Sequence, residues 1–196
     1  MSHHYSPLSN TQLIAGTTYL RPRQQLPERV GSNDPATYVM TDLTKVAAMT
    51  IGPCASIDQA NQRMIASGVR LLLVTDQHHA ILGIITATDL FGERPMRYLQ
   101  EVGGKREDIF VRDIMTGSDH LEVLYMVDVA TARVGDIVET LRRASRQHAL
   151  VVDLDEKHNQ VVRGIFSTKQ ISKQLGMEVE SRGAAASFAE LASSPT

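Results

Sequence analysis

The sequence predicts an α/β (α+β) fold in which two tandem β-α-β-β-α repeats pack as a pseudo-twofold pair, with flexible tails at both ends. The first observation behind this prediction is internal similarity, because residues 56–76 and 133–153 align at a constant offset of 77 positions. Residues 83–86 then match residues 164–167 at an offset of 81, so the second copy carries four extra residues in one loop. A single copy of about 55 residues has a thin core, so the two copies are expected to pack together.

The second observation is the order of helix and strand signals in each copy. Ser56 and Gln59 have the spacing of a capping box, and Gly68 stands where the helix should end. The matching helix start in the second copy is Arg133, so the box is not repeated there. Short apolar runs follow each helix, and their length suits buried strands. These runs span 71–74, 81–86, 149–152 and 161–167, and earlier strands are expected at 48–51 and 122–127.

Changes in composition divide the chain into five predicted parts. The N-terminal part is polar and rich in Pro, and we expect an extended arm that packs on the body. The linker contains a helix that begins at Arg94-Pro95 and ends at Gly103. The C-terminal part is small and polar, so disorder is expected there, with a short frayed helix around Ala184–Ala192. The parts are the arm at 1–33, the first repeat at 34–92, the linker at 93–110, the second repeat at 111–176 and the tail at 177–196.

Composition also argues against several classes of function. The formal net charge of −2 and the absence of Trp argue against broad binding to nucleic acid or to membrane surfaces. No apolar run reaches the roughly 18 residues of a membrane helix, and no secretory signal is visible at the start, so a cytoplasmic location is expected. Cys54 is the sole cysteine, and we expect a small, partly buried residue rather than a nucleophile.

The segment from Gly83 to Asp89 carries the most specific chemistry. Thr86 and Thr88 place two hydroxyls where a strand ends, and Asp89 places a carboxylate where a helix starts. Hydroxyls can donate hydrogen bonds to phosphate oxygens, and a carboxylate can accept them from the paired hydroxyls of a ribose. The alternative is that Thr88 or Asp89 simply caps the helix.

The matching positions of the second copy keep only part of this chemistry. Ser167 retains the hydroxyl of Thr86, whereas Lys169 stands in place of Thr88 and Gln170 in place of Asp89. A lysine can face a phosphate, but a neutral amide is a weaker acceptor for a ribose than a carboxylate. We therefore expect a weaker or differently selective second site.

Together these features resemble a tandem CBS-domain module, the paired cystathionine β-synthase type domains that are also called a Bateman module. The resemblance covers about residues 42–173. It implies a pseudo-twofold pair of repeats with two clefts between them, and modules that pair into homodimers. The segments that carry it are Asp113-Ile114-Met115-Thr116 and residues 68–76, 83–89 and 147–153.

The resemblance implies that the clefts bind an adenine nucleotide, such as AMP, ADP or ATP. The hydroxyls and the carboxylate would meet phosphate and ribose, and the backbone of the first strand would meet the adenine. Two of these residues have an alternative to a ligand contact. Arg70 can form an exposed salt bridge, and His148 can have a structural role. The implied residues are Thr50, Ile51, Arg70, Thr86, Thr88 and Asp89 in the first site, and His148, Ser167, Lys169 and Gln170 in a weaker second site.

Regulation, rather than catalysis, is the function that this sequence predicts. It contains no Walker-type glycine loop, no zinc-spaced Cys/His set and no H-E-x-x-H motif, so we expect no catalytic residue, no metal and no required cofactor. The resemblance implies a sensor that signals to an unidentified protein partner. The alternative is a ligand-free dimer that serves as a protein-interaction scaffold.

Overall fold

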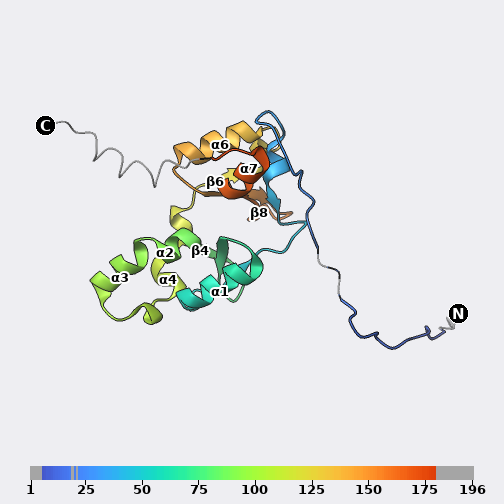
Figure 1. Cartoon of the computed structure of the whole chain (residues 1–196), viewed down its shortest axis with the longest axis horizontal. Helices are drawn as coiled ribbons and strands as arrows, with labels where there is room; N and C mark the ends of the chain where they lie inside the picture. Colours follow the sequence, from blue (N-terminus) through green and yellow to red (C-terminus); the bar gives the residue numbers. More distant parts are fainter. Residues whose placement is uncertain (1–5, 19, 21, 180–196) are drawn as a thin grey trace.

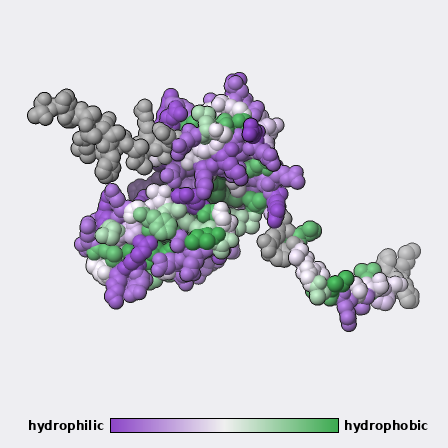
Figure 2. All heavy atoms as spheres, in the orientation of Figure 1, coloured by the Kyte–Doolittle hydropathy of each residue, from purple (hydrophilic) through white to green (hydrophobic). Residues whose placement is uncertain are grey.

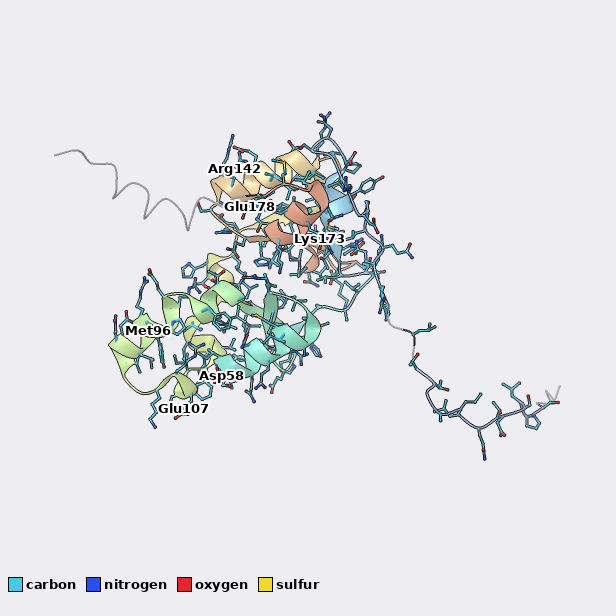
Figure 3. The ribbon with its side chains drawn as sticks, viewed as in Figure 1. Asp58, Met96, Glu107, Arg142, Lys173 and Glu178 are labelled. Atoms are coloured by element: carbon cyan, nitrogen blue, oxygen red, sulfur yellow. The ribbon has the colours of Figure 1, made fainter. Side chains whose placement is uncertain are left out.

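Two four-stranded sheets form the centres of two halves of the molecule (Figure 1). The computed structural model describes residues 6–18, 20 and 22–179. One half contains most of the first repeat and the other contains most of the second, which confirms the predicted α/β pair. Figure 3 labels exposed side chains on the helices of both halves, with Asp58 and Met96 on one half and Arg142 and Lys173 on the other.

The first half has the strand order β2-β3-β4-β5. Strands β2 and β3 are parallel, and the other neighbours are antiparallel. Its elements are β2 (Thr50–Ile51), α1 (Ile57–Ser67), β3 (Leu71–Thr75), β4 (Ile81–Thr86), α2 (Ala87–Phe91), α3 (Arg94–Val102), the 3-10 turn η2 (Arg106–Asp108), α4 (Val111–Ile114) and β5 (Thr116–Gly117).

The second half repeats this arrangement with the strand order β1-β8-β7-β6. It begins with two elements from the start of the first repeat's sequence range, η1 (Ala36–Val39) and β1 (Thr41–Asp42). The others are η3 (Ser118–His120), β6 (Val123–Tyr125), α5 (Met126–Val129), α6 (Val134–Arg143), β7 (His148–Leu154), β8 (Gln160–Ser167) and α7 (Thr168–Leu175).

The helix signals of the sequence are confirmed. The Ser56 hydroxyl accepts a hydrogen bond from the Gln59 N–H at 3.2 Å, and the Gln59 side chain accepts one from the Ser56 N–H at 2.9 Å. Gly68 ends α1 with a φ of 67°, which is the left-handed conformation that favours glycine. Arg133 caps α6 without a side-chain hydrogen bond, although its N–H donates to Asp136 Oδ2 at 2.8 Å.

Each sheet receives one edge strand from the first residues of the other repeat's sequence range. Strand β1 lies near the start of the first repeat but pairs with β8, where Thr41 faces Ile165. Strand β5 lies near the start of the second repeat but pairs with β4, where Thr116 faces Ile84. The sequence ranges 34–92 and 111–176 therefore remain a prediction about sequence units, since in space the two halves exchange these strands.

Two matching glycines allow the exchanged strands to approach. A Cβ atom added to Gly83 would clash with the backbone carbonyl of Thr116 in β5. A Cβ atom added to Gly164 would meet the side chain of Met40, with Sδ at 2.6 Å. The two sites thus need glycine for the same purpose, but backbone opposes one substitution and a flexible side chain opposes the other.

Each half has its own apolar core. In the first half the core joins α1, α2, α4 and the middle strands, with Ile57, Leu72 and Ile85 fully buried. In the second half it joins α6, α7, η1 and the middle strands, with Phe166 and Ile171 fully buried. The junction between the halves is smaller, because its only buried members among the described residues are Leu71, Leu73 and Leu150. Figure 2 shows this boundary from outside, with mostly hydrophilic side chains on the half that contains α6 and α7.

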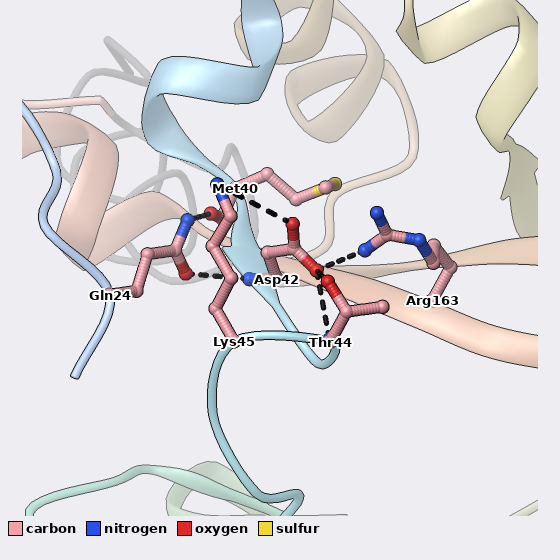
Figure 4. A network of polar contacts seen from close by, with 6 residues as sticks. All are labelled: Gln24, Met40, Asp42, Thr44, Lys45 and Arg163. Carbon is pink, nitrogen blue, oxygen red and sulfur yellow. Dashed lines mark hydrogen bonds and ion pairs between the residues drawn. The ribbon is translucent and has the colours of Figure 1, made fainter. Parts of the chain in front are cut away.

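A polar network fixes β1 to β8 (Figure 4). Asp42 is only 6% exposed, and its carboxylate accepts hydrogen bonds from Arg163 and from the hydroxyl and N–H of Thr44. Gln24 pairs with the backbone of β1, donating to the Met40 carbonyl at 2.9 Å and accepting from the Asp42 N–H at 2.7 Å. Burial would raise the pKa of Asp42, but the bonds from Thr44 and the bond and charge of Arg163 lower it below its usual 3.8.

The two ends differ from the sequence-based expectation in detail. The arm contacts the body from Gln24 onward, and the Pro27 carbonyl accepts a hydrogen bond from the buried Gln174 side chain at 2.7 Å. The earlier apolar side chains of the arm, such as Leu13 and Ile14, are exposed. At the other end Val179 lies in the expected tail, yet it is buried in the second core. The helix expected around Ala184–Ala192 lies outside the described residues.

Substitution of the matching glycines should separate backbone clashes from side-chain clashes. Gly83→Ala is expected to destabilise the protein at or above the upper end of the roughly 1–3 kcal/mol typical of overpacking, because β5 backbone must shift. Gly164→Ala should cost about 1 kcal/mol, because Met40 can rotate away. Urea unfolding of both variants measures the difference, and equal costs would contradict this account.

The Asp42 carboxylate should make the free energy of unfolding depend on pH in the acidic range. Because the pKa of Asp42 is lower in the folded protein, its contribution is present above about pH 4 and is lost as the pH falls through the folded pKa. Wild type should therefore lose stability more steeply than Asp42→Asn as the pH falls below about 4. Urea unfolding at each pH measures both slopes, and parallel slopes would refute the role of this network.

Candidate functional site

A cleft of about 420 Å³ lies where the two halves meet. One wall belongs to the end of β4 and to α2 in the first half. The other belongs to the segment before β6 and to the start of β7 in the second half. Among its lining residues are Thr86, Thr88, Asp89, Gln147 and His148. Volumes of about 300–1,000 Å³ are usual for pockets that hold small molecules, so this cleft can hold one.

The end of β4 places Asp89 in the cleft. Thr86 caps α2, because its hydroxyl accepts a hydrogen bond from the Asp89 N–H at 3.3 Å. In return, Asp89 Oδ2 accepts from the Thr86 N–H at 2.8 Å and from the Thr86 hydroxyl at 2.7 Å. The capping alternative is thus real, with Thr86 as the cap rather than Thr88 or Asp89. The same bonds hold the Asp89 carboxylate in one orientation.

Arg94 approaches the other oxygen of that carboxylate. Its Nη1 atom lies 3.2 Å from Asp89 Oδ1 and donates to the Ile114 carbonyl at 2.7 Å. Asp89 is only 9% exposed, whereas the Arg94 side chain is 44% exposed. The sequence did not single out Arg94, because its place in the cleft depends on how α3 folds back on α2.

One hydrogen bond crosses the cleft directly. The Thr88 hydroxyl, in the first half, donates to Gln147 Oε1 in the second half at 3.1 Å. Thr88 therefore does not cap α2, and its hydroxyl faces the opposite wall. A molecule in the cleft would contact both halves and would compete with this bond.

The second half adds Arg146 and His120 to the lining of the cleft. Arg146 lies 3.2 Å from the Glu122 carboxylate and also donates to the Glu122 carbonyl. His120 lines the same cleft from η3. Neither residue follows a motif, so nothing in the sequence pointed to them except their place just before β6 and β7.

His148 is a largely buried imidazole in the wall of the cleft. Burial lowers the pKa of His148, and the nearby charge of Arg70 lowers it further, to about 4. His148 is therefore neutral at pH 7. Arg70 forms no ion pair within the described part of the chain, so the exposed salt bridge considered for it is not found. The two residues stand together, one charged and one neutral, beside the cleft.

Two other residues predicted for the first site do not line this cleft. Thr50 and Ile51 line a separate, open pocket with Arg63 and Asp76, because β2 and the Asp89 segment lie at different ends of the sheet. The backbone that does face Asp89 comes from the other repeat, at Leu121.

The residues predicted for the second site also lie in different places. His148 lines the cleft of Asp89, although its backbone pairs with Ser167 in the sheet. Ser167 caps α7 without a side-chain hydrogen bond, and Lys169 follows in the first turn of that helix. Gln170 donates to Gln174 Oε1 at 2.8 Å, so its amide supports the buried Gln174 side chain.

Metal-binding side chains and the cysteine are the remaining groups in the described residues that could carry chemistry. In residues 6–18, 20 and 22–179, no group of three or more His, Cys, Asp or Glu side chains is placed to hold a metal ion. Cys54 is exposed in the loop after β2, so the expectation of partial burial was wrong, and Arg112 Nη1 lies 3.1 Å from its sulfur. Within the same ranges, no helix is long and apolar enough to cross a membrane.

The pKa of His148 offers a direct check of the site geometry. An NMR titration of the histidine ring protons should show one residue with a pKa near 4. Arg70→Gln should raise the pKa of His148 but leave it below 6.5, because burial is the larger cause. No change in this pKa on removing the Arg70 charge would show that the two groups are farther apart than described.

Comparison with known proteins shows what this arrangement is similar to. Residues 39–95 match the CBS domain family. A crystal structure of an uncharacterized conserved protein from Pyrococcus horikoshii is similar with a TM-score of 0.54 and 20% identity, and the match covers 77% of this chain and 98% of that chain. No curated protein sequence matches the chain.

Two further similar structures hold ligands. CBSX2 of Arabidopsis thaliana in complex with AMP matches with a TM-score of 0.50 and 20% identity, covering 72% of this chain and 94% of that chain. The CBS domain pair of protein MJ0100, in complex with 5′-methylthioadenosine and S-adenosyl-L-methionine, matches with a TM-score of 0.50 and 18% identity, covering 74% and 97%. At these identities the likeness concerns the fold, which is that of a CBS-domain pair.

Proposed function

We propose that this chain, whose residues 39–95 match the CBS domain family and whose fold is that of a CBS-domain pair, is a regulatory module that binds an adenine nucleotide between its repeats. AMP, ADP and ATP are the candidate ligands. The observation that carries the proposal is the Asp89 carboxylate, which Thr86 holds in place inside a cleft of about 420 Å³ lined by both halves.

Asp89 suits the ribose of such a ligand. A carboxylate accepts hydrogen bonds from both hydroxyls of a ribose, and each bond to a charged group contributes about 1.5–3 kcal/mol. One oxygen already accepts from Thr86, and the other faces Arg94. Each carboxylate oxygen can accept more than one hydrogen bond, so a ribose hydroxyl can share Oδ1 with Arg94.

The phosphate and the base have separate partners in the same cleft. The Thr88 hydroxyl and the guanidinium groups of Arg94 and Arg146 are polar donors that suit a phosphate. Arg70 adds positive charge close to His148. Apolar side chains for the adenine come from Ile84, Leu121 and Leu150. The ligands of CBSX2 and of MJ0100 all contain adenosine, which supports this class of ligand.

Regulation follows from the position of the cleft between two halves. A ligand that contacts both halves favours one arrangement of them, provided that its affinity differs between arrangements. A protein partner that recognises that arrangement then receives the signal. The proposal includes a homodimer in the cytoplasm, and it assigns no catalytic residue. Analytical ultracentrifugation with and without AMP tests the dimer.

A thermal-shift experiment with matched variants tests the ligand. AMP at a hundred times its dissociation constant should stabilise the wild type by about 2.7 kcal/mol. Asp89→Asn, which keeps a side-chain oxygen able to accept from the Thr86 N–H, should remove most of that shift, because the charge that attracts the ribose is lost. Gln170→Ala should retain the shift, because Gln170 lies outside this cleft.

The same experiment distinguishes nucleotide binding from the alternative function, a ligand-free interaction scaffold. ADP, ATP and S-adenosylmethionine are tested beside AMP at the same concentrations. If none of these compounds stabilises the wild type, the chain is better described as a ligand-free interaction scaffold, and the nucleotide proposal fails.

Protonation of His148 gives an independent test of where the phosphate lies. A phosphate beside His148 should raise its pKa from about 4, so binding of AMP near pH 5.5 (roughly one unit below a free histidine) should take up protons. Calorimetry in buffers of different ionisation enthalpy measures this uptake. His148→Gln corrects for protonation of AMP itself, and equal uptake by variant and wild type would place the phosphate elsewhere.

A further inference from the structure

A second cavity of about 660 Å³ lies at the junction between the two halves. Leu121 and Leu150 line both this junction cavity and the nucleotide cleft, so the two spaces are neighbours. Of the nucleotide contacts that the sequence resemblance implied, only Thr50 lines the junction cavity.

Corresponding residues of the two repeats face each other in the junction cavity. The strand registers show the correspondence, because Thr75 pairs with Ile81 in the first sheet as Val152 pairs with Val162 in the second. Leu73 and Leu150 occupy the same place in their central strands. The cavity therefore lies on the approximate twofold axis that relates the repeats, and all but one of these six residues are apolar.

The absence of charge distinguishes this cavity from the nucleotide cleft. None of its sixteen described lining residues is Asp, Glu, Lys or Arg. The nucleotide cleft, by contrast, is lined by Asp89, Arg94, Glu122 and Arg146. A charged molecule in the junction cavity would lose its hydration without gaining an ionic partner, so charge complementarity favours an uncharged occupant.

A few polar groups in the junction cavity are available to such an occupant. The hydroxyls of Thr50 and Thr75 lie in its wall, and neither has a side-chain hydrogen-bond partner within the described residues. Both side chains are half-buried. Their hydroxyls can therefore orient a molecule that bears one or two hydrogen-bonding groups.

The packing of the junction explains why an apolar molecule would bind. Only Leu71, Leu73 and Leu150 are buried there among the described residues, and the surrounding side chains, such as Val123 and Val162, remain partly exposed. Val161, in the wall of the cavity, is 41% exposed. An apolar occupant removes this surface from water, and that burial is favourable in proportion to its area.

We propose that the junction cavity is a second ligand site, which takes a small, uncharged and mainly apolar molecule. Its volume lies in the range of about 300–1,000 Å³ that is usual for such sites. The site differs from the nucleotide cleft in its lining and in its lack of charged side chains, although the two share Leu121 and Leu150.

Titration of the full chain with N-phenyl-1-naphthylamine, an uncharged dye that brightens in apolar surroundings, tests the site. Wild type should bind the dye saturably at one molecule per chain. Val161→Lys places a charge in the cavity wall, and Ala80→Trp fills space at an exposed position of the same cavity. Each should weaken dye binding about tenfold or more. Val127→Lys is the matched control, because Val127 is 75% exposed on α5 outside the cavity, and it should bind as wild type does.

Three results would overturn the proposal. The first is the absence of saturable binding by wild type. The second is equal affinity in the two cavity variants and the control, which would place the dye elsewhere. The third is dye binding that disappears as the chain self-associates in sedimentation, which would make the cavity an interface between copies. Thermal melts confirm that the variants are folded, and the two cavity variants test the site independently.

Discussion

The exchange of edge strands is the constraint on which the rest of this structure depends. Strands β1 and β5 each leave one repeat's segment to complete the sheet of the other half, so neither half can separate without losing a strand. The small apolar junction would hold the halves only weakly by itself, since it buries few side chains. Strand exchange and the Asp42 network therefore fix the relative position of the two walls that form the nucleotide cleft.

One set of hydrogen bonds contributes both to the fold and to the candidate site. The bonds between Thr86 and Asp89 start α2, and they also hold the carboxylate toward the cleft. Arg94 then ties this carboxylate to the Ile114 carbonyl, close to the exchanged strand β5. A ligand that shares Asp89 consequently contacts a group connected to the junction, which is a physical route from occupancy to the arrangement of the halves.

The helices and strands could be predicted from local sequence signals, whereas the way in which they pair in space could not. The Ser56 capping box and the short apolar runs act within a few residues, and the repeat showed that the same elements occur twice. The exchanged strands have two residues each, which is too short to show an alternation of apolar and polar residues. The repeated pairs Met40-Thr41 and Met115-Thr116 were the visible sequence signal for them. The sequence pointed to Thr86, Thr88 and Asp89, and the resemblance implied a cleft between the repeats, but neither showed which residues of the second repeat form the opposite wall.

The most direct test of the central claim is a two-dimensional ¹H–¹⁵N NMR titration of the protein with AMP. The account predicts that the perturbed amides cluster on both walls of the cleft, at residues 86–89 in the first half and 146–148 in the second. Perturbations confined to one half, or located around Thr50 and Ile51, would contradict a nucleotide site built by both repeats.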